Sequence, residues 1–227
     1  MISLRRHQLV YLTDAGWKAV LERPWDAQPR DCLSHWAMRR LPLVVTRQGA
    51  EVAAAGSIAL GLPAPARWDR RRLALHVPRG SVLCQDEFPR IDGALSLLTR
   101  TRRSALQALH SGLREACATA RVFGSHGWQL LTGLEYLRPG SDLDLWVAVD
   151  DAAHADSAAA LLRSFASERL RLDGEFVFGD GSAVAWREWA DWRAGKARAV
   201  MVKHLSGVTL RRDGAWCMGT EQMAVSE

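Results

Sequence analysis

The segment 142–149 is an apolar run that contains two aspartates, two residues apart, directly after a Pro-Gly-Ser turn. Successive side chains of a β-strand point to opposite faces of the sheet. We therefore expect a strand in which Asp142 and Asp144 share one face while Leu143 and Leu145 point into a core. The fold must then contain a sheet with one apolar face and two carboxylates on the other.

Helix and strand patterns alternate through the second half of the chain. Apolar residues recur at spacings of three, four and seven between Ile91 and Thr119, which predicts helix there. The other expected elements are a strand at 120–123, a turn at Gly124-Ser125, a short helix at about 126–132, a helix at about 152–169, a strand at about 170–179, a hairpin turn at Gly179-Asp180-Gly181 and a final β–helix–β stretch. This order predicts a mixed sheet flanked by helices over 91–227.

The first part of the chain has a different character, with short apolar runs separated by turns. Strands are expected at Gln8–Leu12, Leu41–Thr46, Ile58–Leu62 and Leu73–Val77. These runs predict a small β-rich N-terminal domain over 1–90, ahead of a catalytic domain over 91–227. The fold class expected for the whole chain is α+β.

The composition of the chain indicates what kind of partner it binds and in which cellular compartment it works. The net charge of +5 suits a partner that carries phosphates, whether a nucleotide or a polynucleotide. No apolar run has the length of a signal peptide or of a membrane span. The four cysteines are scattered without a CxxC pair, so neither a disulfide framework nor a zinc site is indicated. We expect a cytoplasmic protein.

Two carboxylates on one strand face repel each other unless a cation lies between them. Hard oxygen ligands at alternate positions suit Mg²⁺ (or Mn²⁺), which also takes phosphate oxygens and water. Asp142 and Asp144 are therefore candidate catalytic residues and metal ligands. Asp173 and Glu175 lie two apart on the next expected strand, and one of them is expected as the third acid, with a slight preference for Asp173 as the catalytic group and Glu175 as a metal ligand. The alternative is a solvated strand edge with no chemistry.

A phosphate grip is expected next to these acids. Gly124-Ser125 follows a strand and opens a helix, where backbone N–H groups and a hydroxyl can bind phosphate. Such a pair can also be an ordinary turn or helix cap. Lys203, near the end of an apolar strand, is a candidate for the same phosphates, and His126 is a weaker one. The order strand, Gly-Ser, helix, loop, strand with Asp-x-Asp is the layout of a nucleotidyltransferase site.

The Gly-Ser and Asp-x-Asp run resembles the DNA polymerase β-type nucleotidyltransferase superfamily, although the spacing here is longer than usual for it. The segment GSHGWQLLTGLEYLRPGSDLDLW, residues 124–146, is more specific. It resembles the phosphoribosyl-dephospho-CoA transferase family of malonate decarboxylase, also called malonate decarboxylase holo-[acyl-carrier-protein] synthase. Looser likeness extends to the opening RHQLVYL, to LPLVVTRQ and LALHVP, and to RLDGEFVFGDGSAVAWREWA and VMVKHLSGVTL.

The resemblance implies a defined reaction. The enzyme would transfer the phosphoribosyl-dephospho-CoA group from its triphosphoribosyl precursor to a serine of the acyl-carrier subunit of malonate decarboxylase, releasing diphosphate. The family's paired catalytic aspartates correspond to Asp142 and Asp144. No nucleic acid or membrane partner is implied. Two other functions stay open: a small-molecule nucleotidyltransferase of the antibiotic-modifying type, and a basic nucleic-acid-binding module.

Overall fold

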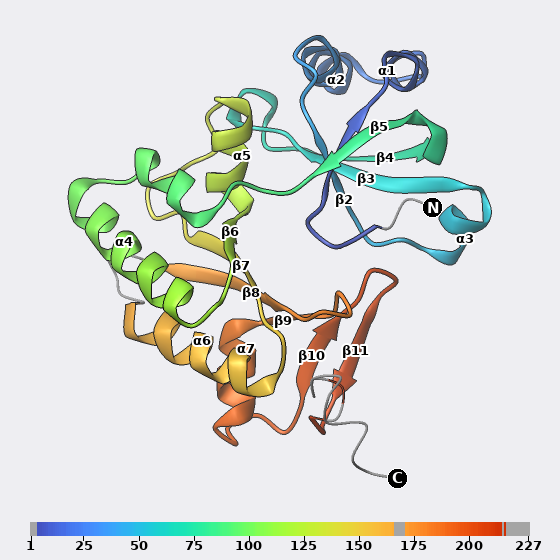
Figure 1. Cartoon of the computed structure of the whole chain (residues 1–227). Helices are drawn as coiled ribbons and strands as arrows, with labels where there is room; N and C mark the ends of the chain where they lie inside the picture. Colours follow the sequence, from blue (N-terminus) through green and yellow to red (C-terminus); the bar gives the residue numbers. More distant parts are fainter. Residues whose placement is uncertain (1–3, 166–170, 215, 217–227) are drawn as a thin grey trace. The chain divides into compact units, whose positions relative to one another are not determined.

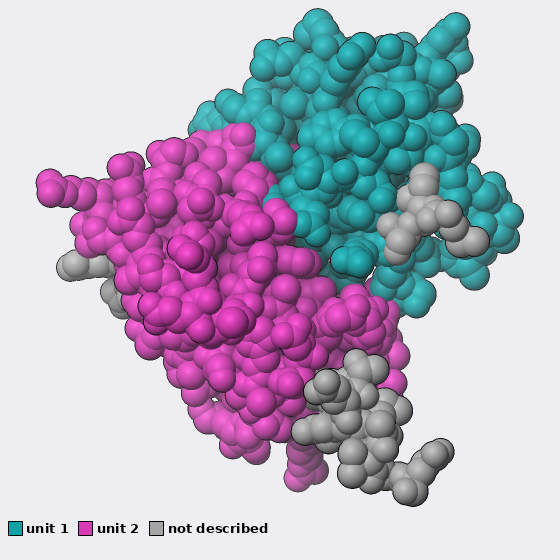
Figure 2. All heavy atoms as spheres, viewed as in Figure 1, with its two compact units in different colours: residues 1–88, 131–136, 205–207 teal, residues 89–130, 137–204, 208–227 magenta. Residues whose placement is uncertain are grey.

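The computed structural model describes residues 4–165, 171–214 and 216, and it divides the chain into two compact units (Figures 1 and 2). Unit 1 comprises residues 1–88, 131–136 and 205–207, and unit 2 comprises residues 89–130, 137–204 and 208–227. Each unit has its own sheet, and the α+β class expected from the sequence is confirmed. Among the described residues, no helix is long and apolar enough to cross a membrane.

Unit 1 is built on a five-stranded antiparallel sheet with the strand order β4-β3-β2-β1-β5. Its strands are β1 (Leu9–Leu12), β2 (Leu43–Val45), β3 (Ser57–Pro63), β4 (Arg72–Pro78) and β5 (Val82–Asp86). The four expected strands are present, because each is an apolar run whose buried side chains face a core. β5 is an additional strand that lies at the sheet edge beside β1.

Unit 1 also contains helices that the sequence analysis missed. The expectation of only short strands and turns is wrong between β1 and β2, where α1 (Asp14–Leu21) and α2 (Ala27–Met38) lie. The Thr13 hydroxyl caps α1 by accepting from the Gly16 N–H at 3.0 Å. In α2, Leu33 and Trp36 are three residues apart and fully buried. The remaining short elements of this unit are α3 (Ala50–Ala54), η1 (Ala66–Trp68) and η2 (Arg79–Ser81).

Unit 2 is built on a six-stranded mixed sheet with the order β11-β10-β9-β8-β7-β6. The strands are β6 (Ala120–Val122), β7 (Leu143–Ala148), β8 (Leu172–Val177), β9 (Ala183–Ala185), β10 (Val200–Lys203) and β11 (Val208–Arg211). β7 and β8 are parallel, and all other neighbours are antiparallel. A parallel pair needs a crossover, and α6 (Ala152–Phe165) provides it. The last residues of the helix expected at 152–169 lie outside the described residues.

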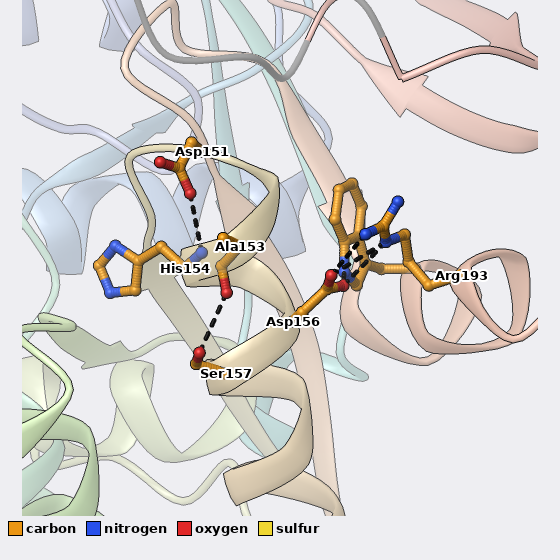
Figure 3. Close-up of polar contacts among 7 residues, drawn as sticks. Asp151, Ala153, His154, Asp156, Ser157 and Arg193 are labelled. Carbon is orange, nitrogen blue, oxygen red and sulfur yellow. Dashed lines mark hydrogen bonds and ion pairs between the residues drawn. The ribbon is translucent and has the colours of Figure 1, made fainter.

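The helices of unit 2 other than α5 (Gly124–Thr132) cover one face of its sheet (Figure 1). They include η3 (Ile91–Leu97), α4 (Arg100–Glu115) and α7 (Trp186–Arg193) as well as α6. The helix expected over 91–119 is thus two elements, and the chain bends at Thr99, the residue before α4. Between α6 and α7, Arg193 donates to the Asp156 carboxylate at 2.6 Å (Figure 3).

The alternation in β7 separates the apolar face of the sheet from the opposite one. Leu143, Leu145 and Val147 are each no more than 2% exposed and belong to the core under the helices. Asp144 and Trp146 are half-buried on the opposite face. The prediction that an apolar core lies on one side of this strand is confirmed, and the opposite face of the sheet is where polar side chains gather.

Candidate active site

The acidic residues of β7 and β8 meet on the face of the sheet opposite the helices. The parallel register pairs Asp144 with Asp173 and Trp146 with Glu175. Residues paired across neighbouring strands point to the same side, so the carboxylates of Asp144, Asp173 and Glu175 gather on one face. Asp142 is the residue just before β7, whereas the sequence analysis expected it inside the strand. It is close enough to act electrostatically on Asp144.

Burial and the neighbouring carboxylates both raise the pKa of Asp144. Burial of the side chain is the largest cause, and the neighbouring carboxylates of Asp173, Asp142 and Glu175 add to it, so that the pKa rises from 3.8 to about 7. Near neutral pH the protein therefore concentrates acidic groups where water cannot solvate them fully. A divalent cation beside these groups would offset the repulsion between the carboxylates and favour the charged form of Asp144.

The raised pKa of Asp144 predicts that Asp144→Asn stabilises the metal-free protein. The folded state holds the Asp144 proton more tightly than the unfolded chain does, so stability falls as the pH rises from about 4 to about 7. Asparagine removes this loss. In buffer with a metal chelator at pH 8, we expect the free energy of unfolding to rise by roughly 2–4 kcal/mol, and at pH 4 we expect no difference from the unsubstituted protein. Thermal or urea unfolding at both pH values measures this, and an equal effect at both would contradict it.

Asp142 is held by an arginine that the sequence analysis did not single out. Arg171 precedes β8, and its Nε lies 2.8 Å from Asp142 Oδ1. The same guanidinium donates to the Gly140 carbonyl at 3.2 Å. The pair ties the loop before β7 to the start of β8. Nothing in the local sequence indicates this contact, because it depends on the register between the two strands.

Gly124 and Ser125 are the first two residues of α5 (Gly124–Thr132), next to Asp144. The Phe123 N–H donates to the Asp144 carbonyl at 3.0 Å, which joins the start of the helix to β7. Gly124 has a φ of +58°, and a Cβ added there would lie 1.8 Å from Asp144 Oδ2. The first N–H groups of a helix lack partners within the helix and favour anions. The expected phosphate grip and the expected acid are therefore in direct contact.

Replacing Gly124 tests that contact. In Gly124→Ala, the new methyl group must displace the Asp144 carboxylate, and we expect the rate of the catalysed reaction to fall about 100-fold. Gly133→Ala is the matched control, because Gly133 has a φ of +70° but nothing within 4 Å of an added Cβ. Both variants should lose roughly 1–2 kcal/mol of stability from backbone strain. Equal activities in the two would show that the Asp144 carboxylate does not need this glycine.

The His126 side chain is buried within the site. Its side chain is 4% exposed. Burial lowers its pKa, while a hydrogen bond to the Asp142 backbone acts in the opposite direction. The imidazole is therefore neutral near pH 7 and supports the residue before β7. This placement differs from the weaker expectation that His126 contacts phosphate.

Glu175 and Lys203 lie on the same face of the sheet and contact each other. The Lys203 ammonium donates to Glu175 Oε1 at 2.6 Å, and the Glu175 side chain is only 8% exposed. From the sequence, Glu175 was expected to bind a metal and Lys203 to bind phosphate, and the ion pair between them was not expected. Asp173, by contrast, is exposed, and its Oδ1 accepts from the Gly174 N–H at 2.8 Å.

A metal ion at the acid cluster would need ligands from a substrate in addition to those from the protein. Within the described residues, no group of three or more His, Cys, Asp or Glu side chains is arranged to hold a metal ion. Mg²⁺ commonly binds one or two carboxylates together with substrate phosphates and water. Asp144, with Asp142 and Asp173 near it and the helix start beside it, offers carboxylates of that kind next to a place for phosphates.

Comparison with known proteins shows which family the chain belongs to. The family model described as phosphoribosyl-dephospho-CoA transferase MdcG C-terminal domain matches residues 90–214, and the corresponding N-terminal domain model matches residues 5–85. The chain belongs to the phosphoribosyl-dephospho-CoA transferase family. The C-terminal family model spans the whole acid cluster, the start of α5 and the pair formed by Glu175 and Lys203.

Curated relatives agree along nearly their full length. A phosphoribosyl-dephospho-CoA transferase of Xanthomonas axonopodis pv. citri is 38% identical over 87% of this chain and 89% of its own. The protein of the same name from Bradyrhizobium diazoefficiens is 34% identical over 90% of this chain and 88% of its own. The protein of the same name from Pseudomonas putida is 31% identical over 84% of this chain and 89% of its own. No solved structure matches this chain.

Proposed function

We propose that this chain is a phosphoribosyl-dephospho-CoA transferase that modifies the acyl-carrier subunit of malonate decarboxylase. It would take the phosphoribosyl-dephospho-CoA group from its triphosphoribosyl precursor, join it to a carrier serine and release diphosphate. Membership of the family supports the activity. The observation in the structure that carries the proposal is the Asp144 carboxylate, set against Gly124 at the start of α5 and beside Asp173.

The acids and the helix start divide the chemistry between them. Asp142 and Asp144 would hold Mg²⁺ (or Mn²⁺), which supplies charge neutralisation on the phosphates when bound. Gly124 and Ser125 would bind the phosphates through the first N–H groups of α5 and the Ser125 hydroxyl. These contacts orient the phosphorus next to the ribose for attack.

Asp173 would accept the proton of the carrier serine. It is exposed, so a residue of another protein can reach it, and it lies beside Asp144 in the register of β7 and β8. The serine oxygen forms a bond to the phosphorus next to the ribose, the bond from that phosphorus to diphosphate breaks, and the serine proton passes to the carboxylate. One phosphodiester and one diphosphate result.

Three broader assignments belong to the same proposal. The first is that the site belongs to the DNA polymerase β-type nucleotidyltransferase superfamily, which is supported by the position of the phosphate grip and the acids on adjacent elements. The second is an N-terminal domain over 1–90 followed by a catalytic domain over 91–227, which would contain the whole acid cluster. A cytoplasmic location fits a carrier substrate that is loaded inside the cell.

The direct test is to incubate the purified protein with Mg²⁺, the triphosphoribosyl precursor and the acyl-carrier subunit, and to weigh the carrier by mass spectrometry. We expect the carrier to gain one phosphoribosyl-dephospho-CoA group and an equal amount of diphosphate to appear. An unmodified carrier, together with turnover of ATP and small alcohols, would instead identify a small-molecule nucleotidyltransferase. Salt-sensitive binding of DNA or RNA without turnover would identify a nucleic-acid-binding protein.

A further inference from the structure

A largely buried ion pair lies beside the acid cluster in unit 2. Lys203 is the last residue of β10 and Glu175 is in β8, and the two strands are separated by β9. The Lys203 Nζ lies 2.6 Å from Glu175 Oε1, with the side chains 26% and 8% exposed. The lysine therefore bridges an intervening strand to reach the carboxylate.

The small side chains of β9 allow Lys203 to contact Glu175 across that strand. Lys203 pairs with Ala183 in the register of β9 and β10, and Glu175 pairs with Ala185 in the register of β8 and β9. Paired residues share a face, so only two methyl groups stand on this face of β9. The lysine stem can lie over these alanines. Its ammonium arrives on the face that carries Asp173, two residues before Glu175 on the same strand.

Stability alone gives a poor account of this pair. Removing two charges from water costs about as much free energy as their attraction returns, and an apolar pair of similar volume often serves as well or better. An ammonium group has three N–H donors, and the contact with Glu175 Oε1 takes one of them. Lys203 also keeps a quarter of its side chain open to solvent. The arrangement holds a partly accessible cation at a fixed place.

We propose that Glu175 is a positioning residue that holds the Lys203 ammonium beside the acid cluster, where it binds the diphosphate that leaves. The inference rests on the proposed function and extends it. Negative charge builds up on the diphosphate as its bond to phosphorus breaks, and a fixed cation stabilises that charge without having to reorganise. Glu175 then acts through Lys203 and not as the metal ligand that its sequence position suggested.

Binding of magnesium diphosphate, measured by calorimetry, tests the role of the lysine without requiring turnover. We expect Lys203→Met to weaken it about tenfold or more. We expect Glu175→Gln to weaken it less, because the amide oxygen still accepts from the ammonium. In the transfer assay both should lower kcat and leave the KM for the carrier unchanged. Lys196→Met is the matched control, since Lys196 forms an exposed pair with Asp191 at 3.9 Å, and it should change neither quantity.

The variant Glu175→Met/Lys203→Met separates positioning from metal binding. It replaces the ion pair by an apolar pair and should fold, whereas single variants leave a charge without its partner. If Glu175 acts through Lys203, the double variant equals Lys203→Met in diphosphate affinity and in kcat. An additive loss, or a higher Mg²⁺ requirement in Glu175→Gln alone, overturns the proposal.

Failure of the proposed function gives a different result. In that case the unsubstituted protein transfers nothing to the carrier. The calorimetric comparison of the unsubstituted protein with Lys203→Met still reports on the ion pair. Equal diphosphate affinity in those two proteins overturns the inference, whatever the transfer assay shows.

Discussion

Asp144→Asn is expected to lower the rate of carrier modification about a thousandfold, the equivalent of roughly 4 kcal/mol of transition-state stabilisation. The amide keeps the size of the side chain and loses the charge that a cation needs. Asp142→Asn should cause a loss of similar size, because in the proposed mechanism the two carboxylates would hold the same metal ion. Steady-state release of diphosphate, with carrier and precursor saturating, measures both.

Asp14→Asn is the control for these two variants. Like Asp142, Asp14 pairs with an arginine, because its Oδ1 lies 3.5 Å from Arg40 Nη2. Asp14 belongs to unit 1, however, and its side chain is exposed. We expect its rate to match that of the unsubstituted protein. The Asp144→Asn protein should also unfold at a higher temperature than the unsubstituted protein at pH 8, so its lost activity cannot come from misfolding. Rates within a factor of two of the unsubstituted protein in both Asp142→Asn and Asp144→Asn would refute the assignment.

Gly174→Ala is expected to cause the largest loss of stability. Gly174 lies in β8 with a φ of +131°, a conformation that favours glycine. A Cβ added there would lie 1.8 Å from the Leu145 carbonyl oxygen of β7. Backbone cannot yield as a flexible side chain can, so β7 and β8 must separate. We expect a loss of about 3–5 kcal/mol, measured by thermal or urea unfolding.

Gly179→Ala provides the comparison for Gly174→Ala, because an added Cβ at Gly179 has nothing within 4 Å. It should unfold close to the unsubstituted protein. The close approach of β7 and β8 at Gly174 also brings Asp173 next to Asp144, the neighbouring pair in the register. Any Gly174→Ala protein that does fold should therefore lose activity as well. A stable and active Gly174→Ala protein would show that the two strands tolerate separation.

Local patterns were enough to predict the elements that carry the acids. The two aspartates that alternate with leucines at the start of the apolar run 142–149 predict a strand with one buried face, and β7 has that structure. The turn residues at 179–181 likewise predict the antiparallel return from β8 to β9. In these places the chemistry of a few neighbouring residues determines the local conformation.

The helices of unit 1 could have been predicted from signals that the sequence contains. Thr13 precedes α1 as its cap, and Trp17 and Val20 follow at helical spacing. Trp36 lies three residues after Leu33 in the same manner. The surrounding apolar runs, which are strands, led to a β-rich interpretation of the whole region. Propensity over short windows does not separate these cases well.

Contacts between strands could not be predicted from the sequence. Arg171 meets Asp142 only because β7 and β8 are parallel and in this register. Lys203 meets Glu175 only because β9 lies between their strands and carries alanines on that face. Strand order is a property of the whole sheet, so residue types and spacing could mark these side chains as candidates without showing which would pair.

Equilibrium binding of Mn²⁺ in the presence of diphosphate tests most directly whether the Asp144 carboxylate holds a metal ion, since it requires neither carrier nor turnover. We expect the unsubstituted protein to bind the ion, Asp144→Asn to bind it at least about tenfold more weakly, and Asp14→Asn to bind it with unchanged affinity. Equal Mn²⁺ affinity in the unsubstituted and Asp144→Asn proteins would contradict the claim that this carboxylate, beside Gly124, holds a metal ion.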